Sequence, residues 1–191
     1  DAANVEPSSD KPSSASPSQS RAVFPEEDLV VAEHAWYPSG DYFYYVFALR
    51  NESEDLTVDY PAVNIVGRDA EGKVVSSDQA VLSVLNPGET MYFTSLAGTG
   101  ATVPRTVEFL PVAPEEYQVH PSQSGSAVFR AVNVSASADA IGGTTFTGEV
   151  ICEKDDKGTD STFGIHVVVV LRDAAGNLVG AVDDFADRPK P

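Results

Sequence analysis

Residues 66–75 read V-G-R-D-A-E-G-K-V-V, and residues 170–179 read V-L-R-D-A-A-G-N-L-V. Each stretch is an apolar run, then Arg-Asp-Ala-x-Gly, then a second apolar run. Aspartate favours the first position of a type I turn, where its side chain accepts a backbone N–H. Glycine three residues later supplies the left-handed conformation that residues with a Cβ avoid. The pattern therefore predicts, in both places, a β-hairpin closed by a type I turn and a G1 bulge.

The two stretches belong to a longer internal repeat. Arg68 and Arg172 are 104 positions apart (172 minus 68), and the match continues upstream without a gap. The same offset pairs further positions, namely Val46 with Val150, Ala48 with Cys152 and Val63 with Val167. A period of this length is too long for a solenoid unit or a propeller blade, and it indicates duplication of a small β domain. We therefore expect an all-β chain of two tandem immunoglobulin-like β-sandwich domains.

Composition sets the expected domain boundaries. We expect a disordered Ser/Pro-rich tether over residues 1–21, a first β-sandwich over 22–119, a linker over 120–126 and a second β-sandwich over 127–191. The tether offers little apolar surface to offset the entropy of ordering. Residue 191 aligns with Pro87, so we expect the second sandwich to lack the strands that close the first. An open sheet edge of this kind would favour pairing with another chain, such as a second copy in a homodimer.

The charge of the chain disfavours some classes of binding partner. The formal net charge is −17, with a pI near 4.3. An acidic surface disfavours nucleic acid and anionic membrane surfaces, both of which are bound through basic faces. No apolar run is long enough to cross a bilayer, so membrane contact is expected only through a lipid anchor upstream of Asp1. The single cysteine, Cys152, allows no intramolecular disulfide, and its apolar surroundings in the sequence predict a buried thiol.

A strand-like stretch with two apolar faces suggests an interaction surface. Residues 42–49 read Y-F-Y-Y-V-F-A-L, whereas the matching residues 146–153 read F-T-G-E-V-I-C-E and alternate. That alternation predicts that Phe146, Val150 and Cys152 face inward. By transfer, the predicted core face of the first domain consists of Tyr42, Tyr44, Val46 and Ala48. The predicted outer face, which needs a partner domain, a second chain or a ligand as cover, consists of Phe43, Tyr45, Phe47 and Leu49.

Residue types that carry catalysis or bind metals do not form a recognisable pattern. The three histidines share no metal-ligand spacing with Cys, Asp or Glu, and no nucleophile signature occurs. We therefore expect no enzymatic activity, no catalytic residue, no metal and no cofactor. The acidic stretch 153–160 has oxygens that could hold Ca²⁺, but two lysines interrupt it and a solvated turn is the expectation. The sequence leaves open whether the 155–160 loop binds calcium.

Two motifs resemble a known family. Residues 168–179 (V-V-V-L-R-D-A-A-G-N-L-V) and 85–90 (L-N-P-G-E-T) resemble the FxLYD-type and related DUF4352-like immunoglobulin-like domains of bacterial surface lipoproteins. Arg172 stands where that family usually has Tyr. The resemblance implies export, lipid anchoring through a cysteine just before Asp1, and no assigned activity.

Taken together, these features favour a non-enzymatic, exported cell-surface protein that is extracytoplasmic and lipid-anchored, and that acts as an interaction or spacer module. The alternative is a small-molecule or glycan-binding module that uses an exposed aromatic face of the first domain, with Trp36, Tyr37, Tyr42, Phe43 and Tyr45. Across both hypotheses, the candidate interface or ligand residues are Trp36, Tyr37, Phe43, Tyr45, Phe47 and Leu49.

Overall fold

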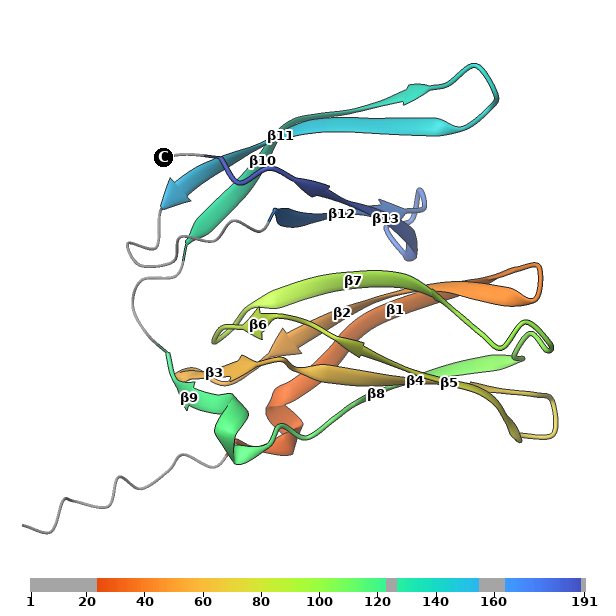
Figure 1. The fold of residues 1–191 in the computed structure, drawn as a ribbon, viewed down its shortest axis with the longest axis horizontal. Helices are drawn as coiled ribbons and strands as arrows, with labels where there is room; N and C mark the ends of the chain where they lie inside the picture. Colours follow the sequence, from red (N-terminus) through yellow and green to blue (C-terminus); the bar gives the residue numbers. More distant parts are fainter. Residues whose placement is uncertain (1–23, 123–126, 155–163, 190–191) are drawn as a thin grey trace, which may run out of the picture.

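The computed structural model describes residues 24–122, 127–154 and 164–189, and these residues form β-strands with two short 3-10 helices (Figure 1). The elements are η1 (Glu26–Asp28), β1 (Leu29–Ser39), β2 (Tyr42–Asn51), β3 (Leu56–Asp59), β4 (Ala62–Arg68), β5 (Val74–Val81), β6 (Val84–Leu85), β7 (Thr90–Ala97), β8 (Thr106–Pro111), η2 (Glu116–Gln118), β9 (Val119–Pro121), β10 (Val128–Ala138), β11 (Thr144–Lys154), β12 (Ile165–Arg172) and β13 (Leu178–Ala186). No α-helix occurs in the described ranges, which confirms the expected all-β chain.

The N-terminal part, residues 24–122, contains three small antiparallel sheets. Their strand orders are β1-β2-β7, β5-β4-β8 and β6-β3-β9. The first two sheets enclose the main core, because Phe47 of β2 lies 5.9 Å from Phe109 of β8 between ring centroids, and Ile65 of β4 is fully buried in the same cluster. This arrangement resembles a β-sandwich.

The core-face prediction for strand β2 was wrong. The face of Phe43, Tyr45, Phe47 and Leu49, predicted to lie outside, is the core face, and none of these side chains is more than 2% exposed. Tyr42 and Tyr44, predicted to lie inside, are 44% and 40% exposed. Strand β2 is apolar on both faces, so its own sequence carries no alternation that could assign them. The four core side chains therefore have no accessible surface to offer a partner or ligand.

The C-terminal part, residues 127–154 and 164–189, consists of two hairpins, β10–β11 and β12–β13, each a separate two-stranded sheet. Figure 1 shows β12–β13 between the β10–β11 hairpin and the β1-β2-β7 sheet. Contacts of β13 with β1, β2 and β7 agree with this order of layers. Strand β12 is apolar on both faces, and its valines are half-buried between the two neighbouring layers (Figure 1). Burial agrees with the inward face predicted for β11, since Phe146, Val150 and Cys152 are half-buried while Thr147, Glu149 and Glu153 are exposed.

The predicted hairpin turns are confirmed in both copies. The amide of Asp69 donates to the carbonyl of Lys73 (3.0 Å), and the Asp69 carboxylate accepts from the Lys73 amide (2.8 Å). Asp173 makes the same two bonds with Asn177, at 3.0 and 2.9 Å. The register of each hairpin shifts beside the turn, and the turn glycines have positive φ, +81° at residue 72 and +87° at residue 176. Each pair of strands is thus closed by the same local chemistry.

Several predicted segments lie outside the described residues or cross an element. The tether over 1–21 and the candidate calcium loop over 155–160 are outside the described ranges. The predicted linker over 120–126 begins inside β9, where His120 pairs with Thr57 and Pro121 with Leu56 of strand β3. Those two positions belong to a sheet of the N-terminal part, so assigning them to a linker was wrong.

Candidate functional site

The most strongly perturbed ionisable groups join the two parts of the chain. The guanidinium of Arg172, at the end of β12, donates to both carboxylate oxygens of Glu33 on β1, at 2.9 and 2.5 Å. The Tyr92 hydroxyl on β7 donates to Glu33 at 2.5 Å and accepts from Arg172 at 3.0 Å. We call these three residues the clamp. It fastens the turn end of the β12–β13 hairpin to the first sheet.

The charges within the clamp stabilise one another. The hydrogen bond from Arg172, with a second from Tyr92, lowers the pKa of Glu33 from 4.5 to about 2. The same contact raises the pKa of Arg172 above its usual value, and acceptance by Glu33 raises the pKa of Tyr92. About a third of the Arg172 and Glu33 side chains remains in contact with solvent, which screens the attraction. At neutral pH Glu33 and Arg172 are therefore both charged, while Tyr92 is neutral.

The N-terminal part contains the counterpart of this clamp within one sheet. Arg68 donates from Nη1 to the carbonyl of Gly72 at 3.1 Å, as Arg172 does to Gly176 at 3.0 Å. Arg68 also donates to Glu108 of the neighbouring strand β8 at 3.0 Å. Arg172 has no such neighbour among the described strands, and it reaches across to Glu33 instead. The repeated arginine thus links strands in one copy and layers in the other.

Strand β13 packs against the first sheet, in contact with β1, β2 and β7. Val46 and Ala48 of β2 are each 1% exposed, although they lie on the face opposite the N-terminal core. Gly180 and Ala181 of β13 are both buried, and a Cβ added at Gly180 would make an ordinary contact 3.6 Å from the Tyr37 ring. The cover that the sequence predicted for β2 is therefore present, but over the face of Val46 and Ala48.

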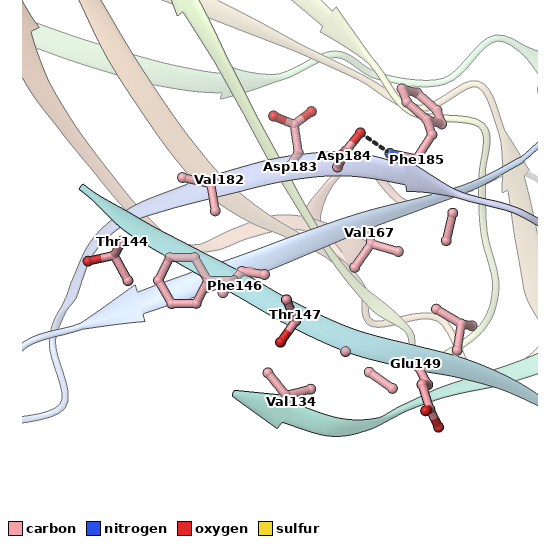
Figure 2. A pocket seen from close by; sticks show the side chains of 15 residues that line it. Val134, Thr144, Phe146, Thr147, Glu149, Val167, Val182, Asp183, Asp184 and Phe185 are labelled. Atoms are coloured by element: carbon pink, nitrogen blue, oxygen red, sulfur yellow. Dashed lines mark hydrogen bonds between the residues drawn. The ribbon is translucent and has the colours of Figure 1, made fainter. Parts of the chain in front are cut away.

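A cavity of about 380 Å³ lies between the two C-terminal hairpins. Figure 2 shows that Phe146 of β11 and Val182 of β13 approach it from opposite hairpins, while Asp183 points away. Apolar side chains line most of it: Ala131, Val134, Phe146, Val150, Val167, Val169, Val182, Phe185 and Ala186. Glu149, Asp183 and Asp184 are the charged residues of the lining, which contains no lysine or arginine. The cavity suits an apolar group with positive charge beside it.

The hydrogen bonds of β4, the strand that matches β12 in the repeat, show which way the backbone groups of such a strand point. In β4 the carbonyls of Arg68 and Ala62 accept from Arg105 and Val112, which places the even-numbered backbone groups toward β8. The amide of Asp69 bonds across the hairpin, so the odd-numbered groups face β5. Alternation therefore assigns each backbone group of β4 to one of its two neighbouring strands.

The same alternation applied to β12 identifies groups that face away from β13. Asp173 bonds across its hairpin to Asn177, so the odd-numbered groups of β12 face β13. The backbone groups of His166, Val168 and Val170 then point to the other edge. Among the described residues, β12 pairs only with β13. This edge and the cavity adjoin each other, because Val167 and Val169 of the same strand line the cavity.

The predicted aromatic candidates separate into two groups. Trp36 is half-buried and packs against Phe43 at 6.0 Å between ring centroids. Tyr37 is 42% exposed and stacks on Tyr44 at 5.3 Å, and the exposed Tyr42 lies in the same hairpin. Burial raises the pKa of Tyr45 to about 12, which keeps its hydroxyl neutral in the core. Of the aromatic candidates, Tyr37 and Tyr42 present the most surface to solvent, and the neighbouring Tyr44 extends this exposed group.

The histidines and the cysteine make separate local contacts. His166 bonds Asp183 at 2.8 Å beside the Phe185 ring, His120 bonds Asp59 at 3.1 Å, and His34 stacks on Phe109. Within the described ranges, no group of three His, Cys, Asp or Glu side chains is arranged to hold a metal ion. Cys152 is half-buried rather than buried, and its thiol donates to the carbonyl of Lys154.

Sequence reasoning missed the clamp and the cavity. The clamp joins residues 139 positions apart, and the only sequence signal for it was that Arg172 repeats Arg68. The cavity had a signal in the uninterrupted valines of β12, which are typical of a strand covered on both faces. In the described part of the chain, no helix is long and apolar enough to cross a membrane. The chain matches no family model, no curated protein and no solved structure.

Proposed function

We propose that this chain is a non-enzymatic interaction module of an exported cell-surface protein. One observation carries the proposal: the C-terminal part holds an apolar-lined cavity beside a strand edge that no other described strand pairs with, and the clamp fixes both against the N-terminal part. Surfaces of this kind bind extended segments of other proteins. The net charge of −17 supports a soluble, cation-attracting surface.

The internal repeat and the family resemblance support the rest of the proposal. We propose that the two parts are duplicated immunoglobulin-like domains, because the two R-D-A-x-G hairpins and their arginine contacts recur at one offset. The second copy is built as two stacked hairpins rather than a closed sandwich. The resemblance to surface lipoprotein domains is the basis for placing the protein outside the cytoplasm on a lipid anchor.

Accessibility to protease on living cells tests the surface location that this proposal assigns to the protein. Intact cells that make the protein are treated with a protease, and the remaining protein is measured with an antibody against the chain. We expect the protein to be degraded while a cytoplasmic protein in the same cells survives. Survival of the protein until the cells are lysed would overturn its assignment to the surface.

A glycan-binding role remains the second candidate, because Tyr37, Tyr42 and Tyr44 form an exposed aromatic group on one hairpin. Aromatic faces of this kind stack on sugar rings. Titration of the protein with oligosaccharides, followed by tyrosine fluorescence, tests this role. Saturable binding that Tyr44→Ala weakens and Tyr117→Ala leaves unchanged would favour it, since Tyr117 is 83% exposed but distant in sequence.

A further inference from the structure

We propose that the C-terminal part binds an extended, positively charged peptide, which adds as an antiparallel strand to the edge of β12 and places alternate apolar side chains in the cavity. The inference rests on the proposed interaction function and names its partner class. Strand addition of this kind draws affinity from main-chain hydrogen bonds and specificity from pockets for alternate side chains.

Strand β8 shows how such a segment sits on the equivalent edge. It pairs antiparallel with β4, with Gly67 opposite Val107 and Ile65 opposite Phe109. The side chains of Val107 and Phe109 are buried in the core, whereas the alternate residues Thr106 and Leu110 are exposed. The chain itself therefore provides an example of the segment that this type of edge accepts.

The register between β8 and β4, applied to β12, predicts which peptide residues face the cavity. Leu171 and Val169 occupy the positions of Gly67 and Ile65, so the peptide residues opposite them would point to the cavity side. Val169 lines the cavity, and a volume of about 380 Å³ accommodates more than one apolar side chain. The peptide pattern is accordingly apolar-x-aromatic, in the order of Val107 and Phe109.

The charge of the site favours basic residues at the remaining peptide positions. The cavity lining holds carboxylates from Glu149 and Asp184, and its third carboxylate, Asp183, is already bonded to His166. Glu149 accepts from Asn133 and Asp184 from the Phe185 amide, so both are hydrogen-bonded without a cation. Lysine or arginine beside the apolar residues would complement this charge. In β8, Glu108 binds Arg68. The matching Arg172 is already bound by Glu33, so the peptide needs no glutamate at the position of Glu108.

A peptide based on β8 tests the proposal. The probe is residues 105–112 of this chain with Glu108→Lys, and the control probe adds Val107→Ser and Phe109→Ser. Binding to the full chain is measured by calorimetry, and the contacted amides are identified by nuclear magnetic resonance. We expect saturable binding of the probe, new protection of the Val168 and Val170 amides, and no binding of the control peptide.

A matched pair of variants separates edge pairing from side-chain contact. Val168→Pro removes one N–H at the open edge and spares the ladder with β13, a position where proline is tolerated. Val168→Ala shortens the same side chain and keeps the N–H. We expect Val168→Pro to weaken probe binding by up to about tenfold, which corresponds to the loss of one main-chain hydrogen bond. Val168→Ala should bind as the unmodified chain does.

Three results would overturn the inference. They are no binding of the probe to the unmodified chain, equal binding by Val168→Pro, and a dimer in light scattering that Val168→Pro converts to a monomer. The last result would assign the edge to a second copy. If the peptide does not bind but the protein is accessible to protease on intact cells, this inference alone is refuted and the proposed surface location stands. Probe binding by a protein that is protected on intact cells would instead refute the surface location.

Discussion

The β4–β5 and β12–β13 hairpins have the same turn but differ in the strands and layers that pack around them. Both place an Asp carboxylate over the turn amides, and both bond the preceding arginine to the turn glycine. Strand β4 continues into a three-stranded sheet through β8, while β12 pairs only with β13 in the described chain. The turn is thus a local property of the sequence, and the assembly around it depends on which strands are available.

This difference in assembly is also a difference in packing. The N-terminal part buries large side chains completely, including Phe43, Phe47 and Ile65. In the described C-terminal part, Ala181 is the one apolar side chain that is buried, and it is still 8% exposed. Because burial of apolar surface is the main source of stability, the N-terminal part should be the more stable of the two.

The largest expected effect contrasts matching core positions. Phe47 and Ile151 are related by the 104-residue offset, but the phenylalanine is 0% exposed and the isoleucine is half-buried. We expect Phe47→Ala to lower the free energy of unfolding by about 3–5 kcal/mol, through lost transfer energy and the cavity left behind. Ile151→Ala should lower the free energy of unfolding by only about 1 kcal/mol, because a half-buried side chain contributes less buried apolar surface. Urea denaturation measures both, and equal losses would contradict the packing difference.

The turn glycines should respond equally in the two hairpins. Gly72 and Gly176 have φ of +81° and +87°, and a Cβ at either would meet no atom within 4 Å. Alanine at either position should therefore cost about 1–2 kcal/mol from backbone conformation alone. Urea denaturation of Gly72→Ala and Gly176→Ala compares them directly. A loss at one position alone would show that the two turns are not equivalent.

The clamp should stabilise the chain in a pH-dependent way. Glu33→Gln should lower the free energy of unfolding at neutral pH by about 0.5–1 kcal/mol, because the attraction is partly screened. The folded-state pKa of Glu33, about 2, lies below its ordinary 4.5, so its contribution is complete above pH 4.5 and is lost as pH falls toward 2.

Thermal unfolding from pH 7 to pH 2 checks this dependence. The difference in midpoint between the unmodified chain and Glu33→Gln should be constant above pH 4.5 and should shrink below it. A difference that stays the same down to pH 2 would mean that the Glu33 charge does not hold the two layers together.

The smallest effect is expected at the matching pair in the N-terminal part. Glu108 is 43% exposed and bonds Arg68, but main-chain pairing already joins β8 to β4. Glu108→Gln should change the free energy of unfolding by only about 0.2–0.5 kcal/mol. Chemical denaturation side by side with Glu33→Gln provides the comparison. A larger loss at Glu108 would show that the repeated arginine matters more within a sheet than between layers.

The sequence predicted those features that neighbouring residues determine. Asp69 and Gly72 specify their turn within four positions, and the repeat at Asp173 predicted its copy. The faces of β2 could not be predicted, because a strand that is apolar on both sides has no alternation to read. The aromatic core set, including Phe43, was therefore assigned to the surface. The clamp between Glu33 and Arg172 depends on how distant layers stack, which no local pattern encodes.

Amide hydrogen exchange along β4 and β12 tests the central comparison most directly. In β4 every backbone group faces a neighbouring strand, so the amides of Val66 and Ile65 should both exchange slowly. In β12 the Val167 and Val169 amides should be protected by β13, while those of Val168 and Val170 should exchange fast. Slow exchange at Val168 and Val170, comparable to Val66, would show that the β12 edge is already paired and would contradict the open edge.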